Sequence, residues 1–293
     1  MIEIVTTQAR RFDDFQSALE ANDTDKILIH DGTGTKTITA ANFKADLLAT
    51  LDAMQTTINQ LTFPGAGPHN SIFRGKNLGD HVTPEQWAAI ADGSFTGLYI
   101  GDYWVIGGIT WRIAAFSYFA IGLGAINVPH VLIVPDDPIA SASMNATDTT
   151  AGGYYGSLMR TTNLTQAKTI VSAAFGSHVK SHQMLLSTAA TINGAAGWAW
   201  VDSDVELMNE VAVYGSQASG RNDGHGAYNT GSLPGRFPLF VFRGDLAFSP
   251  GADAWLNSIV DDARFGNTSG SGAPGLTGAS GIKGVRPFFA ITA

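Results

Sequence analysis

The chain has no cysteine, few charged residues and no cluster of basic residues, and each shortage excludes a class of protein. Without cysteine there is no disulfide framework, no thiolate metal site and no cysteine nucleophile. Charged residues make up 14% of the 293 residues, against roughly 25% in an average soluble domain. The net charge is −8 and the 17 Lys and Arg residues are scattered, so we expect no nucleic-acid partner.

Segments typical of export or membrane insertion are also lacking. The N-terminal MIEIVTTQARRFDDF carries acidic residues where a signal peptide would be apolar. Residues 113–134 contain no Asp, Glu, Lys or Arg, but Gly, Asn, Pro and His interrupt this segment. The alternation of residue types along this segment predicts strands. We therefore expect no membrane span, and assembly in a cytoplasm.

Glycine is abundant, with 34 residues, which is typical of a loop-rich and largely β protein. The stretch KILIHDGTGTKTIT (residues 26–39) predicts a short β-hairpin within an N-terminal attachment segment, residues 1–37. Residues 38–62 predict a helix with an apolar seam at spacings of four, three, four and three: Leu47, Leu51, Met54, Ile58 and Leu61. Uncharged flanking positions fit a trimeric coiled coil at least as well as a dimer, while a single amphipathic helix packed on its own domain gives the same spacing.

The remaining chain predicts a linker and one globular domain of mixed α+β class. FPGAGPHNS (residues 63–71) has two Pro and two Gly in nine residues and is typical of a linker. Within 72–293 the patterns predict a hairpin around Gly107-Gly108, a strand at 131–135, a helix at 161–176, a helix running into a strand at 202–215, and a buried strand at 236–246. Long polar loops at 216–235 and near 262–281 are the segments we expect to be functional.

No group of residues makes a convincing catalytic or metal site. His178 and His182 have the i, i+4 spacing of two metal ligands, but they lack a third ligand and the Glu of a zinc hydrolase, so ordinary histidines are favoured. Asp202, Asp204 and Glu206 could pair as glycosidase carboxylates, but the same acids suit a helix N-terminus. Serine-nucleophile and phosphate-loop motifs are absent. We therefore expect no enzymatic activity, metal or cofactor.

Four short motifs, in order and spacing, give a resemblance to a known family: GDYW (101–104), GITWRI (108–113), VELM (205–208) and GVRP (284–287). With the surrounding sequence from about Ser71 to Ala293, they resemble a C-type-lectin-like domain of phage tail and fibre proteins, including variable proteins diversified by retroelements. The hairpin and helix before it are similar to N-terminal segments of phage fibre proteins. The resemblance implies a virion location, contacts with other virion proteins through the N-terminus, and a homotrimer.

The resemblance also implies a ligand-facing surface between the Trp-Leu pair at 255–256 and GVRP. Carried over, the expected contact residues are Asn257, Asp261, Asp262, Arg264, Asn267, Leu276 and Thr277. The sugar-binding motifs and disulfides of calcium-dependent lectins are missing, so calcium-mediated glycan binding is not expected.

Together these observations favour a receptor-binding protein of a phage tail or fibre, which recognises a host-surface protein or glycan non-covalently. A virion decoration protein without a ligand, and a polysaccharide hydrolase, are the alternatives. In the terminal GIKGVRPFFAI (281–291), we expect Arg286 and Pro287 to form a structural clasp. Arg286 would donate to carbonyls of the preceding loop and Pro287 would begin the last strand.

Overall fold

The structure is a computed structural model that describes residues 24, 26–30, 34–61, 65–120, 125–220 and 235–293. The chain divides into two compact units, Met1–Thr62 and Phe63–Ala293. Each unit is described by itself.

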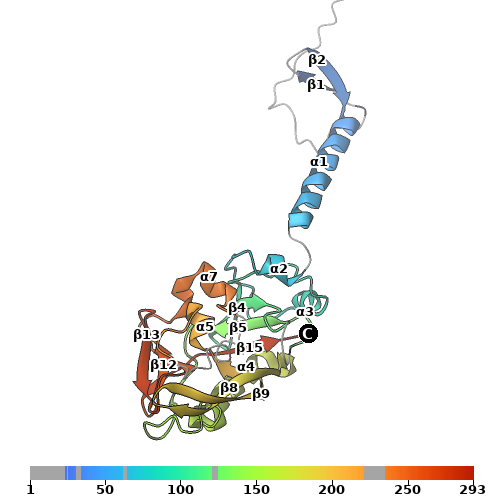
Figure 1. Ribbon diagram of the computed structural model, residues 1–293. Helices are drawn as coiled ribbons and strands as arrows, with labels where there is room; N and C mark the ends of the chain where they lie inside the picture. Colours follow the sequence, from blue (N-terminus) through green and yellow to red (C-terminus); the bar gives the residue numbers. More distant parts are fainter. Residues whose placement is uncertain (1–23, 25, 31–33, 62–64, 121–124, 221–234) are drawn as a thin grey trace, which may run out of the picture. The chain divides into compact units, whose positions relative to one another are not determined.

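In the first unit an antiparallel hairpin leads directly into a long helix (Figure 1). Strand β1 (Lys26–His30) pairs with β2 (Thr35–Thr39), and helix α1 (Ala40–Leu61) follows. The Thr39 hydroxyl accepts a hydrogen bond from the Asn42 N–H at 3.2 Å, which satisfies one of the unpaired donors at the start of the helix. The expected hairpin and helix are confirmed. In α1, side chains are described only as far as Leu51.

The core of the second unit is a six-stranded sheet whose central strands are buried along their whole length. The strand order is β10-β15-β5-β4-β3, and β7 pairs with β15. These strands are β3 (Tyr103–Ile106), β4 (Ile109–Phe116), β5 (Val131–Pro135), β7 (Val179–Lys180), β10 (Val205–Leu207) and β15 (Pro287–Ile291). Gly107 and Gly108 both have positive φ, as a tight turn between β3 and β4 requires.

A second, five-stranded sheet has the order β13-β12-β11-β14-β6. Its strands are β6 (Ala140–Ser143), β11 (Ala254–Ile259), β12 (Arg264–Thr268), β13 (Pro274–Gly278) and β14 (Ile282–Val285). Only the β11–β14 pair is parallel. Arg286 alone separates β14 from β15, so the last two strands of the chain belong to different sheets.

A long hairpin and several short helices complete this unit (Figure 1). The hairpin consists of β8 (His182–Thr191) and β9 (Gly194–Ser203). The helices are α2 (Ala66–His69), α3 (Pro84–Ala91), α4 (Leu164–Phe175), α5 (Glu210–Tyr214) and α7 (Pro238–Phe242), with short helical turns η2 (Met159–Asn163), η3 (Gly176–His178) and η4 (Gly244–Ala247). The fold is therefore mixed α+β with mostly β-sheet, as expected. No helix in the described part of the chain is long and apolar enough to cross a membrane.

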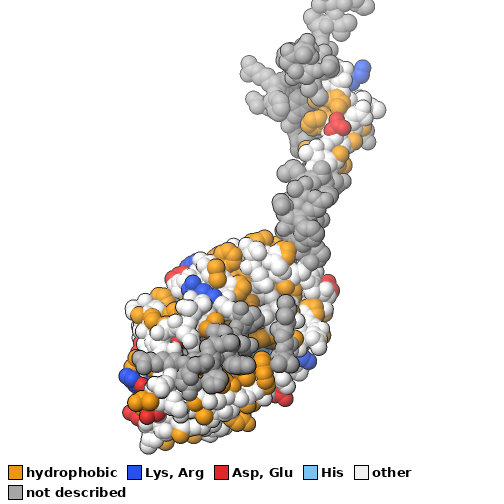
Figure 2. Space-filling view, in the orientation of Figure 1, with side chains coloured by type: hydrophobic (Ala, Val, Ile, Leu, Met, Phe, Trp, Pro, Cys, Tyr) orange, Lys and Arg blue, Asp and Glu red, His pale blue; other side chains and the backbone are white. Residues whose placement is uncertain are grey.

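Charged side chains are sparse on the face of the second unit in Figure 2, in keeping with the composition.

The expected linker at 63–71 includes residues that pack in this unit. The His69 ring is buried beside Phe95, Tyr99 and Phe116. The Asn70 side chain both donates to the Phe116 carbonyl and accepts from the Phe116 N–H. From Ala66 onward, this segment belongs to the globular packing.

Two expected elements are wrong. Residues 236–246 form α7 and η4 instead of a buried strand, because Pro238 begins a helix and the buried residues Phe237, Leu239 and Phe240 do not alternate. In 202–215 the order is reversed. Strand β10 comes first, and α5 follows with Asn209 as its N-cap, the Asn209 Oδ1 accepting from the Ala212 N–H at 2.8 Å.

Candidate functional site

The candidate site lies on one face of the five-stranded sheet, here called the outer face. Residues directly opposite each other in paired strands share a face, and residues alternate along each strand. The register therefore places these residues on the outer face: Ser141, Ala254, Arg264, Gly266, Thr268, Leu276, Gly278, Ile282 and Gly284. The opposite face carries Trp255 and Phe265, which are buried in the core.

Three of the seven expected contact residues are exposed together. Arg264 and Leu276 are neighbours on the outer face, because Arg264 lies opposite Gly278 and Leu276 lies opposite Gly266. Asp262 is exposed in the turn between β11 and β12. These three side chains are available to a ligand.

The other four contact residues are used within the domain. Asn257 donates from Nδ2 to the Leu207 carbonyl of β10 at 2.9 Å. Asn267 is buried on the inner face, where its Oδ1 accepts from the Thr277 hydroxyl at 3.0 Å. Asp261 is buried in the turn. The expectation of ligand contact is therefore wrong for the buried side chains of Asn267 and Asp261, and it stays a prediction for the partly buried Asn257 and Thr277.

Asp261 fixes the position of Arg264. Its Oδ1 accepts the N–H groups of Ala263 at 3.1 Å and Arg264 at 2.9 Å, and its Oδ2 accepts from Arg264 Nε at 2.7 Å and from Nη2. Burial opposes ionisation of Asp261, but hydrogen bonds and charge from Arg264 outweigh it and hold the Asp261 pKa below its ordinary value. The guanidinium side chain nevertheless remains 45% exposed.

A segment from far along the sequence locks this turn from the side. The Thr150 hydroxyl donates to the Asp261 carbonyl at 2.6 Å, and the Thr150 N–H donates to the Asp262 carbonyl at 2.9 Å. Nearby, Asp148 Oδ1 accepts both the N–H and the hydroxyl of Ser280, at 2.8 and 2.7 Å. The exposed side chains therefore project from a braced backbone.

Glu210, the first residue of α5, ties the start of the 216–235 loop to this sheet. Its carboxylate is almost fully buried and accepts three consecutive backbone N–H groups, from Ala218 at 2.8 Å, Ser219 at 2.9 Å and Gly220 at 2.9 Å. A Cβ added at Gly266 would lie 3.1 Å from this carboxylate. Glu210 thus packs between the loop and the outer face of β12, and sequence reasoning missed it because the contact is long-range.

The other flank of the same loop is held by Tyr118. Its hydroxyl donates to the Gly235 carbonyl and accepts the Gly235 N–H, and burial raises the Tyr118 pKa. Arg236 Nε donates to the Val213 carbonyl at 2.9 Å. Residues 221–234, which include most of the polar loop expected to bind, lie outside the described residues.

Arg286 is a structural residue, but its partners differ from those expected. It is buried, and it donates from Nε to the Pro135 carbonyl at 2.8 Å and from Nη2 to the Leu246 carbonyl at 2.7 Å. Burial lowers the Arg286 pKa to about 10. The bonded carbonyls end β5 and lie in η4, so Arg286 joins those segments instead of supporting the 262–281 loop. Pro287 does begin β15, as expected.

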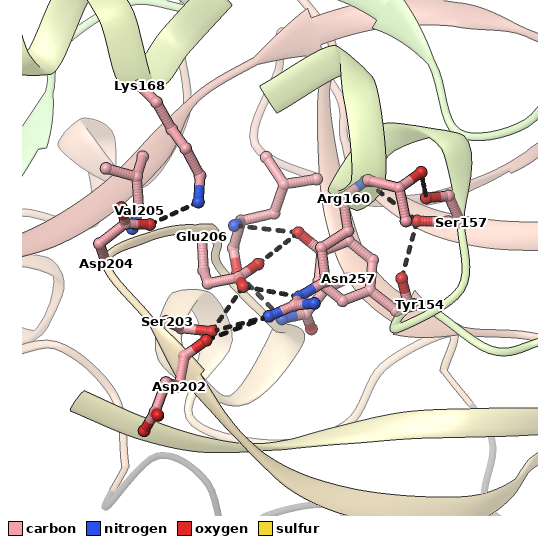
Figure 3. A network of polar contacts seen from close by, with 12 residues as sticks. Tyr154, Ser157, Arg160, Lys168, Asp202, Ser203, Asp204, Val205, Glu206 and Asn257 are labelled. Atoms are coloured by element: carbon pink, nitrogen blue, oxygen red, sulfur yellow. Dashed lines mark hydrogen bonds and ion pairs between the residues drawn. The ribbon is translucent and has the colours of Figure 1, made fainter. Parts of the chain in front are cut away.

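Of the three acids considered as glycosidase residues, only Glu206 is buried, at the centre of a polar network (Figure 3), while Asp202 is exposed and Asp204 is partly exposed. Glu206 accepts from the Tyr154 hydroxyl at 2.7 Å, Ser203 Oγ at 2.6 Å and Arg160 Nε at 2.9 Å. Asp204 pairs with Lys168 at 2.5 Å. None of these acids caps a helix, since Glu206 and Asp202 lie in strands β10 and β9. With its oxygens occupied and its side chain buried, Glu206 has a structural geometry.

His178 and His182 do not converge on a shared site. His178 stacks on Trp87 with ring centroids 3.8 Å apart, and its Nδ1 bonds to the Thr292 carbonyl at 2.8 Å. His182 stacks on Phe119 at 4.0 Å in the core. The described residues contain no group of three or more His, Cys, Asp or Glu side chains that could hold a metal ion.

Comparisons with known proteins give no relative: no family model, curated protein or solved structure matches the chain. The chemistry of the site therefore rests on the residues themselves. A guanidinium, a carboxylate and an aliphatic side chain on a braced turn and strand offer charge, hydrogen bonding and apolar contact without a nucleophile. This combination suits reversible recognition of a surface.

Proposed function

We propose that the protein is a receptor-binding protein of a phage tail fibre or tail tip, and that it recognises a host-surface molecule through the outer face of the five-stranded sheet. The observation that carries the proposal is the exposed group of Asp262, Arg264 and Leu276 on a turn and strand pair that Asp261, Thr150 and the β12–β13 ladder hold in place. The resemblance of 71–293 to C-type-lectin-like phage domains supports the proposal, and we assign the globular unit to that fold.

A preorganised frame favours binding because little conformational entropy is lost when the ligand arrives. Asp261 and Thr150 fix the turn, and Glu210 fixes the adjoining loop. Substitutions at Asp262 and Leu276 would then change the surface without disturbing the fold, whereas the Arg264 side chain also belongs to the frame through Asp261. This separation of frame and surface is what a recognition domain with changing targets needs.

Helix α1 supports a homotrimer that displays three such domains. Its described apolar side chains Phe43, Leu47, Leu48 and Leu51 are between 40% and 59% exposed. Two further copies of the same helix would cover them in a coiled coil. We propose that the preceding hairpin and residues 1–23 attach the trimer to other virion proteins.

The test is binding of fluorescently labelled full-length protein to host bacteria, together with competition against phage adsorption. Saturable binding is expected, with a large loss for Asp262→Arg and Leu276→Asp. Gln183→Ala, at an exposed position in β8, is the control that should bind like the wild type. Equal binding by all variants would show that the outer face is not the binding surface. If the wild-type protein did not bind host bacteria and did not reduce phage adsorption, the result would instead support a decoration protein. Electron microscopy of virions with the protein labelled would give its location and symmetry.

A further inference from the structure

An apolar patch is exposed where helix α7 meets the segment that follows α2. Its side chains are Ile72, Phe73, Val241 and Phe242, and we call this surface the α7 patch. Val241 is 63% exposed and Phe242 is 43% exposed. The rings of Phe73 and Phe242 lie 6.5 Å apart between centroids, and hydrophobic side chains are visible over α7 in Figure 2. An exposed apolar group of this kind indicates a surface that a partner covers.

The α7 patch is held rigidly by the domain beneath it. Leu239 and Phe240 bury the other side of α7 in the core. A Cβ added at Gly101 would lie 2.1 Å from the Phe73 ring, so this ring lies directly on the backbone of residue 101. Little conformational freedom would be lost if a partner covered the patch. The two exposed residues of α7 contribute little to the core, so packing within the domain does not explain why they are apolar.

The charges beside the patch are paired within the domain. The Arg243 guanidinium lies 5.5 Å from the centre of the Phe73 ring and pairs with Asp245 at 2.6 Å. Arg74, which follows Phe73 in the chain, pairs with the buried Asp102 at 2.5 Å. The chain as a whole has a net charge of −8, which opposes contact between copies. Because the charges around it are paired, the α7 patch can meet an identical patch without this repulsion.

The patch is also close in the chain to the helix that we propose joins the copies. Residues 62–65 separate α1 from α2, and residues 72–73 follow α2 closely. Domains tethered by so short a segment are held at a high effective concentration, so a small contact between them can form. Four side chains are too few to hold copies together alone, since a stable interface has about 20–30 residues on each side. The patch therefore suits a contact that adds to the association through α1.

We propose that the α7 patch is a contact between the globular domains of neighbouring copies of this chain. A second copy offers the same apolar side chains and the same paired charges, which match the patch. The inference rests on the proposed function, because it takes the homotrimer as the assembly. Covering the patch would stabilise association and leave the folding of each domain nearly unchanged. The outer faces of the copies would then have a fixed arrangement, which favours simultaneous binding to several receptors.

Thiol labelling of the full-length protein tests the contact, because the chain has no cysteine and a single introduced thiol can be followed. Val241→Cys is compared with Ile192→Cys, a matched site that is 69% exposed in the turn between β8 and β9. Each variant is made with native α1 and with Leu47→Asp and Leu51→Asp, which should separate the copies. Assembly should slow maleimide labelling at position 241 by about tenfold and leave labelling at position 192 unchanged.

Mass photometry on dilution measures the effect of the patch on association. Val241→Asp should raise the concentration at which the full-length protein dissociates by about tenfold. Ile192→Asp makes a similar change elsewhere and should dissociate like the wild type. Thermal melting of the separated copies, with and without Val241→Asp, checks that the domain remains folded.

The proposal is overturned if an oligomeric protein is labelled equally fast at position 241 with native and substituted α1, or if Val241→Asp dissociates at the wild-type concentration. A monomeric full-length protein would overturn it together with the homotrimer. Slow labelling at position 241 that persisted after substitution of α1 would show that the same chain covers the patch. Host-cell binding without protection at position 241 would reject the contact and leave the receptor-binding function standing. Protection without host-cell binding would retain the contact and reject that function.

Discussion

The two large sheets of the globular unit meet solvent in different ways. In the six-stranded sheet, every residue of β5, β10 and β15 is buried. In the five-stranded sheet, the edge strands β13 and β6 have no fully buried residue. The inner strands β11 and β12 of the five-stranded sheet are largely buried as well. The difference therefore indicates that surface chemistry is concentrated at the edges of the five-stranded sheet, although the two sheets are consecutive in the chain at Arg286.

The largest expected effect is from Phe289→Ala in β15. Phe289 packs against Trp111 and Phe175, with ring centroids 5.5 and 5.2 Å away, so truncation leaves a cavity and should cost about 3–5 kcal/mol of unfolding free energy. Chemical denaturation measures it. Phe242→Ala, at a ring that is 43% exposed, is the matched control and should cost less than about 1 kcal/mol. Similar losses in both would show that burial of the Phe289 ring in the six-stranded sheet is not the source of the effect.

The free energy of unfolding should also depend on pH, through the buried His182. Burial lowers the pKa of His182 to about 4, and the charge of His130 contributes in the same direction while the Lys180 carbonyl and Asp204 oppose it. Because the unfolded pKa is about 6.5, the unfolded chain binds the proton first. This stability is fully present above pH 6.5 and is lost as the pH falls toward 4.

The expected loss from this histidine between pH 7 and pH 4 is about 3 kcal/mol. Denaturant unfolding of wild type and His182→Phe gives the free energy of unfolding of each protein at both pH values. The fall in this free energy from pH 7 to pH 4 should be larger in the wild type, and the difference between the two falls measures the contribution of His182. The phenylalanine would keep the stack on Phe119 and lose the titration. Equal pH slopes in the two proteins would show that His182 does not titrate in this way.

At the junction of the sheets, Arg286→Ala should cost about 2–3 kcal/mol, because the carbonyls of Pro135 and Leu246 lose their donor. Hydrogen exchange should show lost protection first in η4, residues 244–247, and little change in 262–281. The opposite distribution of exchange would restore the view that Arg286 supports the C-terminal loop.

On the five-stranded side, Glu210→Gln should cost about 1–2 kcal/mol, because the amide places an N–H₂ group against backbone donors. The exchange of Ala218, Ser219 and Gly220 amides should rise, since these three groups bond to the carboxylate. Glu85→Gln, at an exposed site in α3, is the control for the change of charge. Unchanged exchange at 218–220 would refute the anchoring role of Glu210.

Local signals in the sequence were sufficient for several elements. The Gly107-Gly108 turn, the helix ending at Gly176 and the strand beginning at Pro287 are all present, because each depends on residues close in sequence. The 236–246 segment failed because a short apolar run does not distinguish a strand from a helix. Pro238, read as a helix start, would have corrected it.

Prediction of the site would have required long-range information that local sequence patterns do not contain. Asn267 and Asp262 both read as polar loop residues, yet one is buried opposite Gly275 and the other is exposed. Their faces follow from the register of β12 and β13 and from the position of the turn. Likewise, the bond of Thr150 to Asp261 joins residues 111 positions apart, so no window of sequence could have shown it.

The smallest expected effect on stability, and the most informative about function, comes from Leu276→Ser compared with Thr277→Val. Leu276 is 45% exposed on the outer face, so its substitution should change the unfolding free energy by less than about 0.5 kcal/mol while reducing host-cell binding. Thr277→Val removes the hydroxyl that donates to buried Asn267, and should cost about 1 kcal/mol with little effect on binding. Adjacent residues in one strand would then give opposite outcomes in melting and binding assays. If both variants lost binding in proportion to stability, the outer face would have no recognition role separate from the fold.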